Sequence, residues 1–156
     1  MNNTGQLRTL NVFDDGGKID LQIIEEFEAK TGHTFPEDYK SLLSQHDYLS
    51  PEENTFDFKF DEKCHSRDIS FFGYDESCDD ERIHRVQQDE NSHDNIVVFG
   101  GSANGDFVCF DYRSNLNTPT VIVMFHDMYD NASKMITTPV SSTFEDFIDS
   151  LYIPES

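Results

Sequence analysis

The chain has 156 residues, of which 31 are acidic and 11 are Lys or Arg, so its formal net charge is −20. This length suits a single domain with one core, and 14 Phe without any Trp predict a core built on phenylalanine. The excess of carboxylates disfavours nucleic acids and anionic membranes, because both are bound largely through Lys and Arg. A charge this large repels itself, and binding a basic partner would relieve that repulsion. The alternative is that the charge only keeps a small protein soluble.

The first ten residues are polar and lack the layout of a secretory signal, and no apolar run approaches the roughly 18 residues of a membrane-spanning helix. The three cysteines, Cys64, Cys78 and Cys109, are an odd number without the spacing of a disulfide framework. Such cysteine use fits a reducing compartment. We therefore expect a cytoplasmic protein with free thiols.

Residues 1–18 are predicted to form a leader that ends in a turn, with an extra strand around residues 10–13. Residues 19–156 are predicted to form one domain, which begins with an amphipathic helix. The apolar residues of this helix lie mainly along one face: Leu21, Ile23, Ile24 and Phe27. Asp20 is predicted to cap its start, and Gly32 suits the left-handed position after its last turn.

A second helix is predicted to carry Pro36 in its first turn, with Thr34 and Glu37 as a capping box. Its buried stripe is Tyr39, Leu42 and Leu43. The alternating residues Phe56, Phe58 and Phe60 then indicate a half-buried strand.

Further strands are predicted at residues 69–72, 96–99, 107–112, 121–125 and 135–138, with a hairpin turn at residues 100–106. A closing helix is predicted to start at Ser142 or Thr143, with Ser142 and Glu145 as a capping box. Helices that bracket consecutive strands predict an α+β fold. We expect a mostly antiparallel sheet of about five or six strands, with two N-terminal helices and one C-terminal helix packed on it.

The stretch from Asp75 to Asp94 holds eight acidic residues against Arg82 and Arg85. It is predicted to be a surface helix or a partly ordered loop, pinned to the body by Ile83 and Val86. Such an anionic patch would steer a basic partner toward itself. The alternative is an ordinary solvated face. The predicted partner-binding residues are Asp75, Glu76, Asp79, Asp80, Glu81, Asp89 and Glu90.

Patterns for catalysis or metal binding are weak. His126 and Asp127 follow an apolar strand, but there is no Gly-x-Ser-x-Gly elbow, and such a pair is more typical of a capped turn than of a catalytic dyad. A zinc site made from Cys64, His65, Cys78 and His84 would lack any Cys-x-x-Cys pair. The glycines between residues 100 and 105 lack the Lys-Ser/Thr pair of a phosphate-binding loop.

Carboxylates beside Lys59 and Lys63, namely Asp57, Asp61 and Glu62, faintly resemble a nuclease site, but a nuclease would ordinarily carry a basic surface. We therefore predict no enzyme, no metal and no cofactor. A metal-dependent hydrolase that uses His126 and Asp127 or the Cys64 group remains an alternative.

Three blocks carry a resemblance to a known family. They are IEEFEAKTGHTFPEDYKSLL (24–43), IVVFGGSANGDFVCFDYRSNLNTPTVIVMFHD (96–127) and SSTFEDFIDSLY (141–152). Together they resemble the SUKH superfamily, Knr-like branch. The chain departs from that pattern at Gln45–Tyr48, where many relatives have an Asn-Gly-Gly type turn, and residues 64–95 have no match.

The resemblance implies a bacterial immunity protein that binds and neutralises a cognate toxin, such as a nuclease or a deaminase. It implies no catalysis. The acidic surface adds the expectation that the toxin is basic. Because some members of the superfamily act as regulatory protein-binding scaffolds, that role is the alternative.

Overall fold

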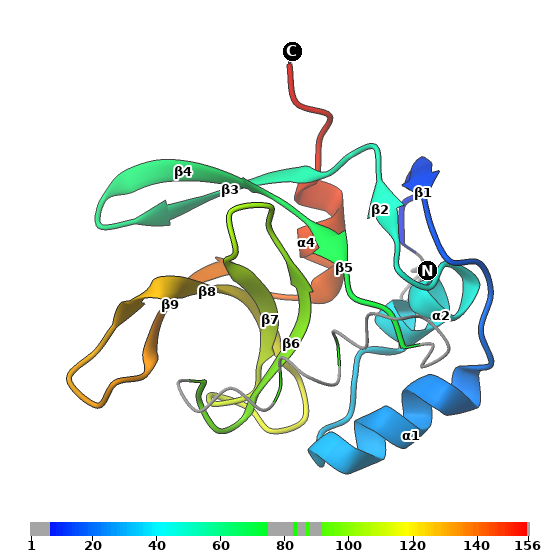
Figure 1. Cartoon of the computed structure of the whole chain (residues 1–156), viewed down its shortest axis with the longest axis horizontal. Coiled ribbons are helices and arrows are strands. Elements are labelled where there is room, and N and C mark those ends of the chain that lie inside the picture. Colours follow the sequence, from blue (N-terminus) through cyan, green and yellow to red (C-terminus); the bar gives the residue numbers. More distant parts are fainter. Residues whose placement is uncertain (1–6, 75–82, 84–86, 88–91, 156) are drawn as a thin grey trace, which may run out of the picture.

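The computed structural model describes residues 7–74, 83, 87 and 92–155. Its centre is a five-stranded antiparallel sheet in the order β5-β6-β7-β8-β9 (Figure 1). The strands are β5 (Ser70–Phe71), β6 (Ile96–Gly101), β7 (Phe107–Asp111), β8 (Thr120–Tyr129) and β9 (Met135–Ser141). The predicted α+β class and the mostly antiparallel sheet are confirmed. The strand predicted at residues 121–125 is too short, because β8 continues as a partly exposed hairpin arm with β9.

The first helix, α1 (Leu21–Thr31), begins and ends where its sequence predicts. The Asp20 carboxylate accepts a hydrogen bond from the Gln22 backbone N–H, and Gly32 takes the left-handed conformation with φ of 78°. The closing helix is α4 (Phe144–Ser150). Thr143 caps it by accepting from the Asp146 N–H, so the predicted capping box is wrong in its residues.

The second helix, α2 (Glu37–Gln45), begins later than its predicted capping box. Its N-cap is Pro36, which makes no side-chain capping hydrogen bond. The preceding loop is held by other elements instead, because the Tyr112 hydroxyl donates to the Thr34 carbonyl and the Phe35 N–H donates to the Glu28 carboxylate. The prediction of Thr34 as a cap is therefore wrong, because the helix begins only at Glu37 and its N-cap is Pro36.

Two small sheets flank the central one (Figure 1). Strand β1 (Val12–Asp14) pairs with β2 (Ser50–Pro51), which confirms an extra strand near the predicted place. Strand β3 (Thr55–Phe60) forms a hairpin with β4 (Lys63–Asp68), which the sequence did not predict. Asp61 and Glu62 make its tight turn with φ of 55° and 66°, the sign pattern of a type I′ turn. The hairpin is tied to β9, because the Thr138 hydroxyl donates to the Lys59 carbonyl.

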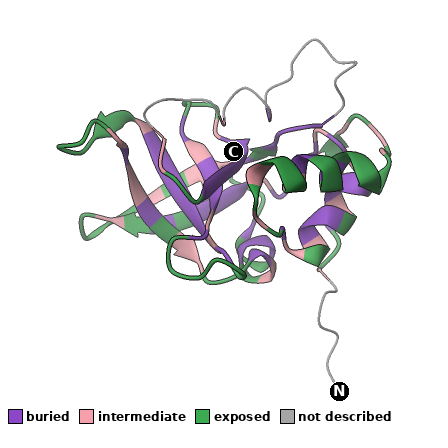
Figure 2. Cartoon of the chain, turned by 90° about the horizontal axis from the view of Figure 1, so that it is seen from below, coloured by how far each residue is buried: buried purple, intermediate pink, exposed green. Residues whose placement is uncertain are grey.

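Phenylalanine rings fill the space between the helices and the central sheet, as predicted. Phe99 on β6 stacks on Phe110 of β7 with ring centroids 4.2 Å apart. Phe144 and Phe147 of α4 meet Phe99 edge to face at 5.8 Å and 6.1 Å. The sheet strands are therefore largely buried, whereas most of α1 faces solvent (Figure 2). Of the predicted stripe on α2, Tyr39 and Leu43 are buried and Leu42 is half-buried.

Candidate functional site

The predicted partner-binding residues lie outside the described part of the chain. These are Asp75, Glu76, Asp79, Asp80, Glu81, Asp89 and Glu90. The end of the acidic stretch is described, and Asp94 is exposed just before β6. Of the two residues predicted to pin the stretch, Ile83 is completely buried, and Val86 lies outside the described residues.

A second anchor of the acidic stretch, Gln87, was not predicted. Its side-chain amide pairs with the backbone of Val98 on β6, accepting from the N–H at 3.0 Å and donating to the carbonyl at 2.6 Å. Strand β5 pairs with β6 only at Gly100 and Gly101. Beyond the end of β5, the Gln87 amide therefore makes the backbone hydrogen bonds that a neighbouring strand would otherwise make. Gln87 thus places one point of the acidic stretch beside the edge of β6, and its side-chain amide also donates to the Ile83 carbonyl at 3.1 Å.

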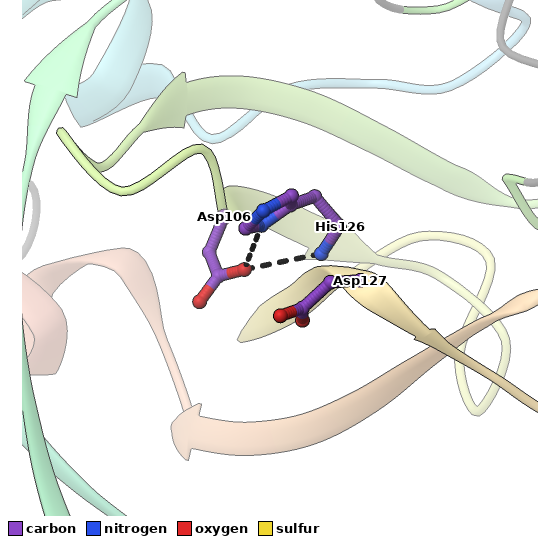
Figure 3. Close-up of side chains that lie close together, drawn as sticks. All are labelled: Asp106, His126 and Asp127. Atoms are coloured by element: carbon purple, nitrogen blue, oxygen red, sulfur yellow. Dashed lines mark hydrogen bonds and ion pairs between the residues drawn. The ribbon is translucent and has the colours of Figure 1, made fainter.

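A hydrogen-bonded polar cluster lies where β4, β8 and the β6–β7 turn meet. Figure 3 shows its members Asp106 and His126, with Asp127 beside them. At its centre is the Asp106 carboxylate, whose side chain is only 3% exposed. One oxygen accepts from the backbone N–H of His126 and lies 2.7 Å from Nδ1 of the same residue. The other oxygen accepts from Arg67 Nε at 3.0 Å and from the Asn104 amide at 3.1 Å.

This bonding stabilises the charged form of Asp106. Burial alone would raise the pKa of its carboxyl, but the hydrogen bonds from His126, Arg67 and Asn104 lower it below the ordinary value. The His126 ring also lies close to Gly105, where an added Cβ would come within 3.3 Å of three ring atoms. The cluster thus fastens a glycine-containing turn to two other strands.

The prediction from sequence paired His126 with the adjacent Asp127 at the end of a strand, and the structure corrects this. Both residues lie inside β8, and the partner of His126 is Asp106, twenty positions earlier. Asp127 is exposed. Among the described residues, no Ser or Cys side chain makes a hydrogen bond with the free ring nitrogen of His126.

Asp106, His126 and Asp127 also form a set of metal-type ligands, with one ligand atom from each lying within 4.8 Å of the others. Carboxylate and imidazole groups suit a divalent cation. However, both oxygens of Asp106 already accept two hydrogen bonds, one from the cationic Arg67. A metal ion would have to displace these donors. The hydrogen bonds of Asp106 therefore fit a role in holding the turn better than a role in binding a metal.

The other chemical candidates are dispersed. Cys64 and His65 are neighbours on β4, where successive side chains point to opposite faces of the hairpin. Cys64 is an exposed free thiol, and His65 stacks on Phe58. Cys78 and His84 lie outside the described residues. Asp57 accepts from the Ser66 and Tyr152 hydroxyls, and Asp61 and Glu62 form the hairpin turn.

The match to a family model covers most of the chain. Residues 18–150 match the SMI1 / KNR4 family (SUKH-1). The chain belongs to the SMI1/KNR4 family. The comparison with curated proteins gave no match. None of the described helices of this SMI1/KNR4 family member is long and apolar enough to cross a membrane.

Several cations of this SMI1/KNR4 family member are used in internal ion pairs. Those in ion pairs with carboxylates of the same chain are Arg8, Lys40, Arg67 and Arg113. Lys40 is nearly buried between Glu28 and Glu37, at 3.2 Å and 2.9 Å. Meanwhile carboxylates such as Glu25 on α1 and Asp149 on α4 remain exposed. These exposed carboxylates place negative charge on the surface.

Proposed function

We propose that this member of the SMI1/KNR4 family is a cytoplasmic, non-enzymatic immunity protein that binds and neutralises a cognate basic toxin, such as a nuclease or a deaminase. The observation that carries the proposal is the excess of 31 acidic residues over 11 Lys or Arg, with carboxylates such as Glu25 and Asp149 exposed on the surface. A surface of this sign attracts a basic protein and repels nucleic acids and anionic membranes. Family membership supports a protein partner.

In this proposal the acidic stretch is part of the contact surface, within a single domain formed by residues 19–156. The steering residues are Asp75, Glu76, Asp79, Asp80, Glu81, Asp89 and Glu90. Ile83 and Gln87 support it, since Ile83 is buried and the Gln87 side chain is hydrogen-bonded to β6, and neither contact uses a carboxylate. Charge would set the association rate, and buried apolar anchors would set most of the affinity.

The function is tested first in cells. The protein encoded beside this gene is expressed alone and together with this chain, and growth is measured. We expect the neighbouring protein to arrest growth alone and to be neutralised by this chain, with the two proteins purifying as a complex. A neighbour that is harmless, combined with capture of unrelated client proteins, would favour the regulatory scaffold instead.

The steering surface is tested with purified partners by stopped-flow association at several salt concentrations. Reversing Asp79, Asp80 and Glu81 to Lys is expected to slow association by about tenfold at low salt and to flatten its salt dependence. A matched control reverses three exposed carboxylates elsewhere, Glu25, Glu26 and Asp149, and changes the net charge equally. If both triple variants slow association to the same extent, only net charge matters and the proposed steering surface is wrong.

A further inference from the structure

A small cleft opens between the first turns of α2 and α4, beside the loop that precedes β8. Its volume is about 240 Å³. Its main walls are apolar or acidic side chains from these three segments: Phe35, Pro36, Asp38, Pro119, Phe144 and Glu145. A volume below the roughly 300 Å³ of the smallest ordinary ligand pockets is suited to one side chain of a partner rather than to a cofactor.

The cleft carries two carboxylates and no cation. Asp38 and Glu145 are both half-buried, and the lining contains no Lys, Arg or His. Within the described part of the chain, neither carboxylate forms an ion pair. Asp38 Oδ1 accepts the backbone N–H of Tyr39 at 2.8 Å, and no side-chain donor bonds to either oxygen of Asp38 within the described part of the chain.

The two carboxylates also repel each other. Burial raises the pKa of the Asp38 carboxyl, the Tyr39 N–H opposes this, and the charges of Glu145 and Glu37 raise it further. Glu37 is compensated by Lys40 at 2.9 Å, whereas no Lys or Arg among the described residues pairs with Glu145. A cationic group placed in the cleft would remove this repulsion, and a neutral ligand would not.

We propose that this cleft receives an Arg or Lys side chain from a basic protein partner. The aliphatic stem would lie against the proline and phenylalanine walls, and the cationic head would meet Asp38 and Glu145. The two carboxylates come from different helices, and a guanidinium with five donors can bond to both at once, so arginine is the better fit. The inference deepens the proposed function, because it identifies an anchor site in the described part of the chain, separate from the acidic stretch.

A larger groove of about 390 Å³ lies on the other side of Asp38, between the N-terminal segment and α2. Its lining includes Arg8 as well as Asp38, and it includes His46, which pairs with Asp15. The charges in this groove are thus mixed, and it is a poorer match for a basic side chain than the smaller cleft.

The cleft is tested without any toxin, using the full chain and the blocked tripeptide acetyl-Gly-Arg-Gly-amide. Amide resonances are followed by two-dimensional NMR as the peptide is added. We expect shifts concentrated at Tyr39, Thr118 and Asp146, with a Kd in the millimolar range that a single side chain gives. The same peptide with citrulline, the neutral isostere of arginine, is expected to cause no saturable shifts.

Variants then assign the binding to the two carboxylates. The double variant Asp38→Asn and Glu145→Gln keeps the shape and the acceptor for Tyr39, and is expected to bind the arginine peptide about tenfold more weakly. The control, Glu25→Gln with Asp149→Asn, removes the same charge from exposed positions and should bind as the wild type does. Equal binding of the citrulline peptide, or undiminished binding by the cleft variant, would overturn the proposal.

Failure of this test and failure of the proposed function are distinguishable. The peptide titration depends only on the cleft, whereas growth neutralisation depends on the toxin. A chain that neutralises a toxin but ignores the arginine peptide is an immunity protein without this anchor.

Discussion

Replacing Asp106 by Ala tests whether the polar cluster holds the β6–β7 turn. The substitution removes a carboxylate that accepts four hydrogen bonds, including one from Arg67. Breaking a buried ion pair by removing one partner costs about 3–5 kcal/mol. The side chains of Arg67 and His126 are 22% and 40% exposed, so water can partly solvate them. We therefore expect the lower end, a loss of about 3 kcal/mol in the free energy of unfolding.

The assay is equilibrium unfolding in urea, with thermal unfolding alongside. For a domain of this size, about 3 kcal/mol corresponds to a fall of roughly 6–12 °C in Tm. The matched control is Asp127→Ala, which removes an exposed carboxylate beside His126 and should change stability by less than about 0.5 kcal/mol. If the Asp106 and Asp127 variants were equally stable, the cluster would not hold the turn.

The pH dependence gives an independent check. The folded-state pKa of Asp106 is lowered, so its contribution to stability is present above the ordinary carboxyl value of 3.8 and is lost as pH falls through the folded pKa. The stability difference between the wild type and Asp106→Asn should therefore be constant near neutral pH and shrink below about pH 4. A difference that grew on acidification would contradict the assigned bonding.

Two further substitutions test single contacts. Gln87→Leu removes the amide that pairs with Val98, so two backbone groups lose their partner. We expect urea unfolding to show a fall of about 1–3 kcal/mol in the free energy of unfolding. An unchanged urea midpoint would show that water replaces the amide. Gly105→Ala adds a Cβ to a residue with φ of 102° beside the His126 ring. The same measurement is expected to show a fall of about 1–3 kcal/mol in the free energy of unfolding. A variant more stable than the wild type would contradict the assigned backbone strain.

Local signals in the sequence predicted the elements that depend on nearby residues. Asp20 and Gly32 bound α1 as expected, because their contacts are made within a few positions of the helix ends. Thr34 failed as a cap because α2 begins only at Glu37, and the loop before it is held by residues far away in the chain, such as Tyr112. Strand β4 was missed because its residues, Lys63–Asp68, are polar throughout and its turn lacks Asn or Gly.

The polar cluster could not be predicted from the sequence for a related reason. Asp106 reaches His126 only because β7 and β8 pair in the register that sets Phe107 opposite Met124. Asp127 is the next residue after His126 in the sequence, and for that reason it was predicted as the partner instead. The glycine-rich segment before Asp106 indicated that the chain turns there. It did not indicate which side chain Asp106 would contact. The predicted steering residues lie outside the described residues and stay a prediction.

The pairing of Gln87 with Val98 also bears on self-association. An uncovered strand edge offers backbone groups to which another molecule can add a strand. The chain's net negative charge keeps copies apart, but salt screens that repulsion beyond about 8 Å at physiological ionic strength. The Gln87 amide acts at hydrogen-bond distance and is insensitive to such screening. At this point of β6, protection against edge-to-edge aggregation therefore persists in salt that weakens charge repulsion.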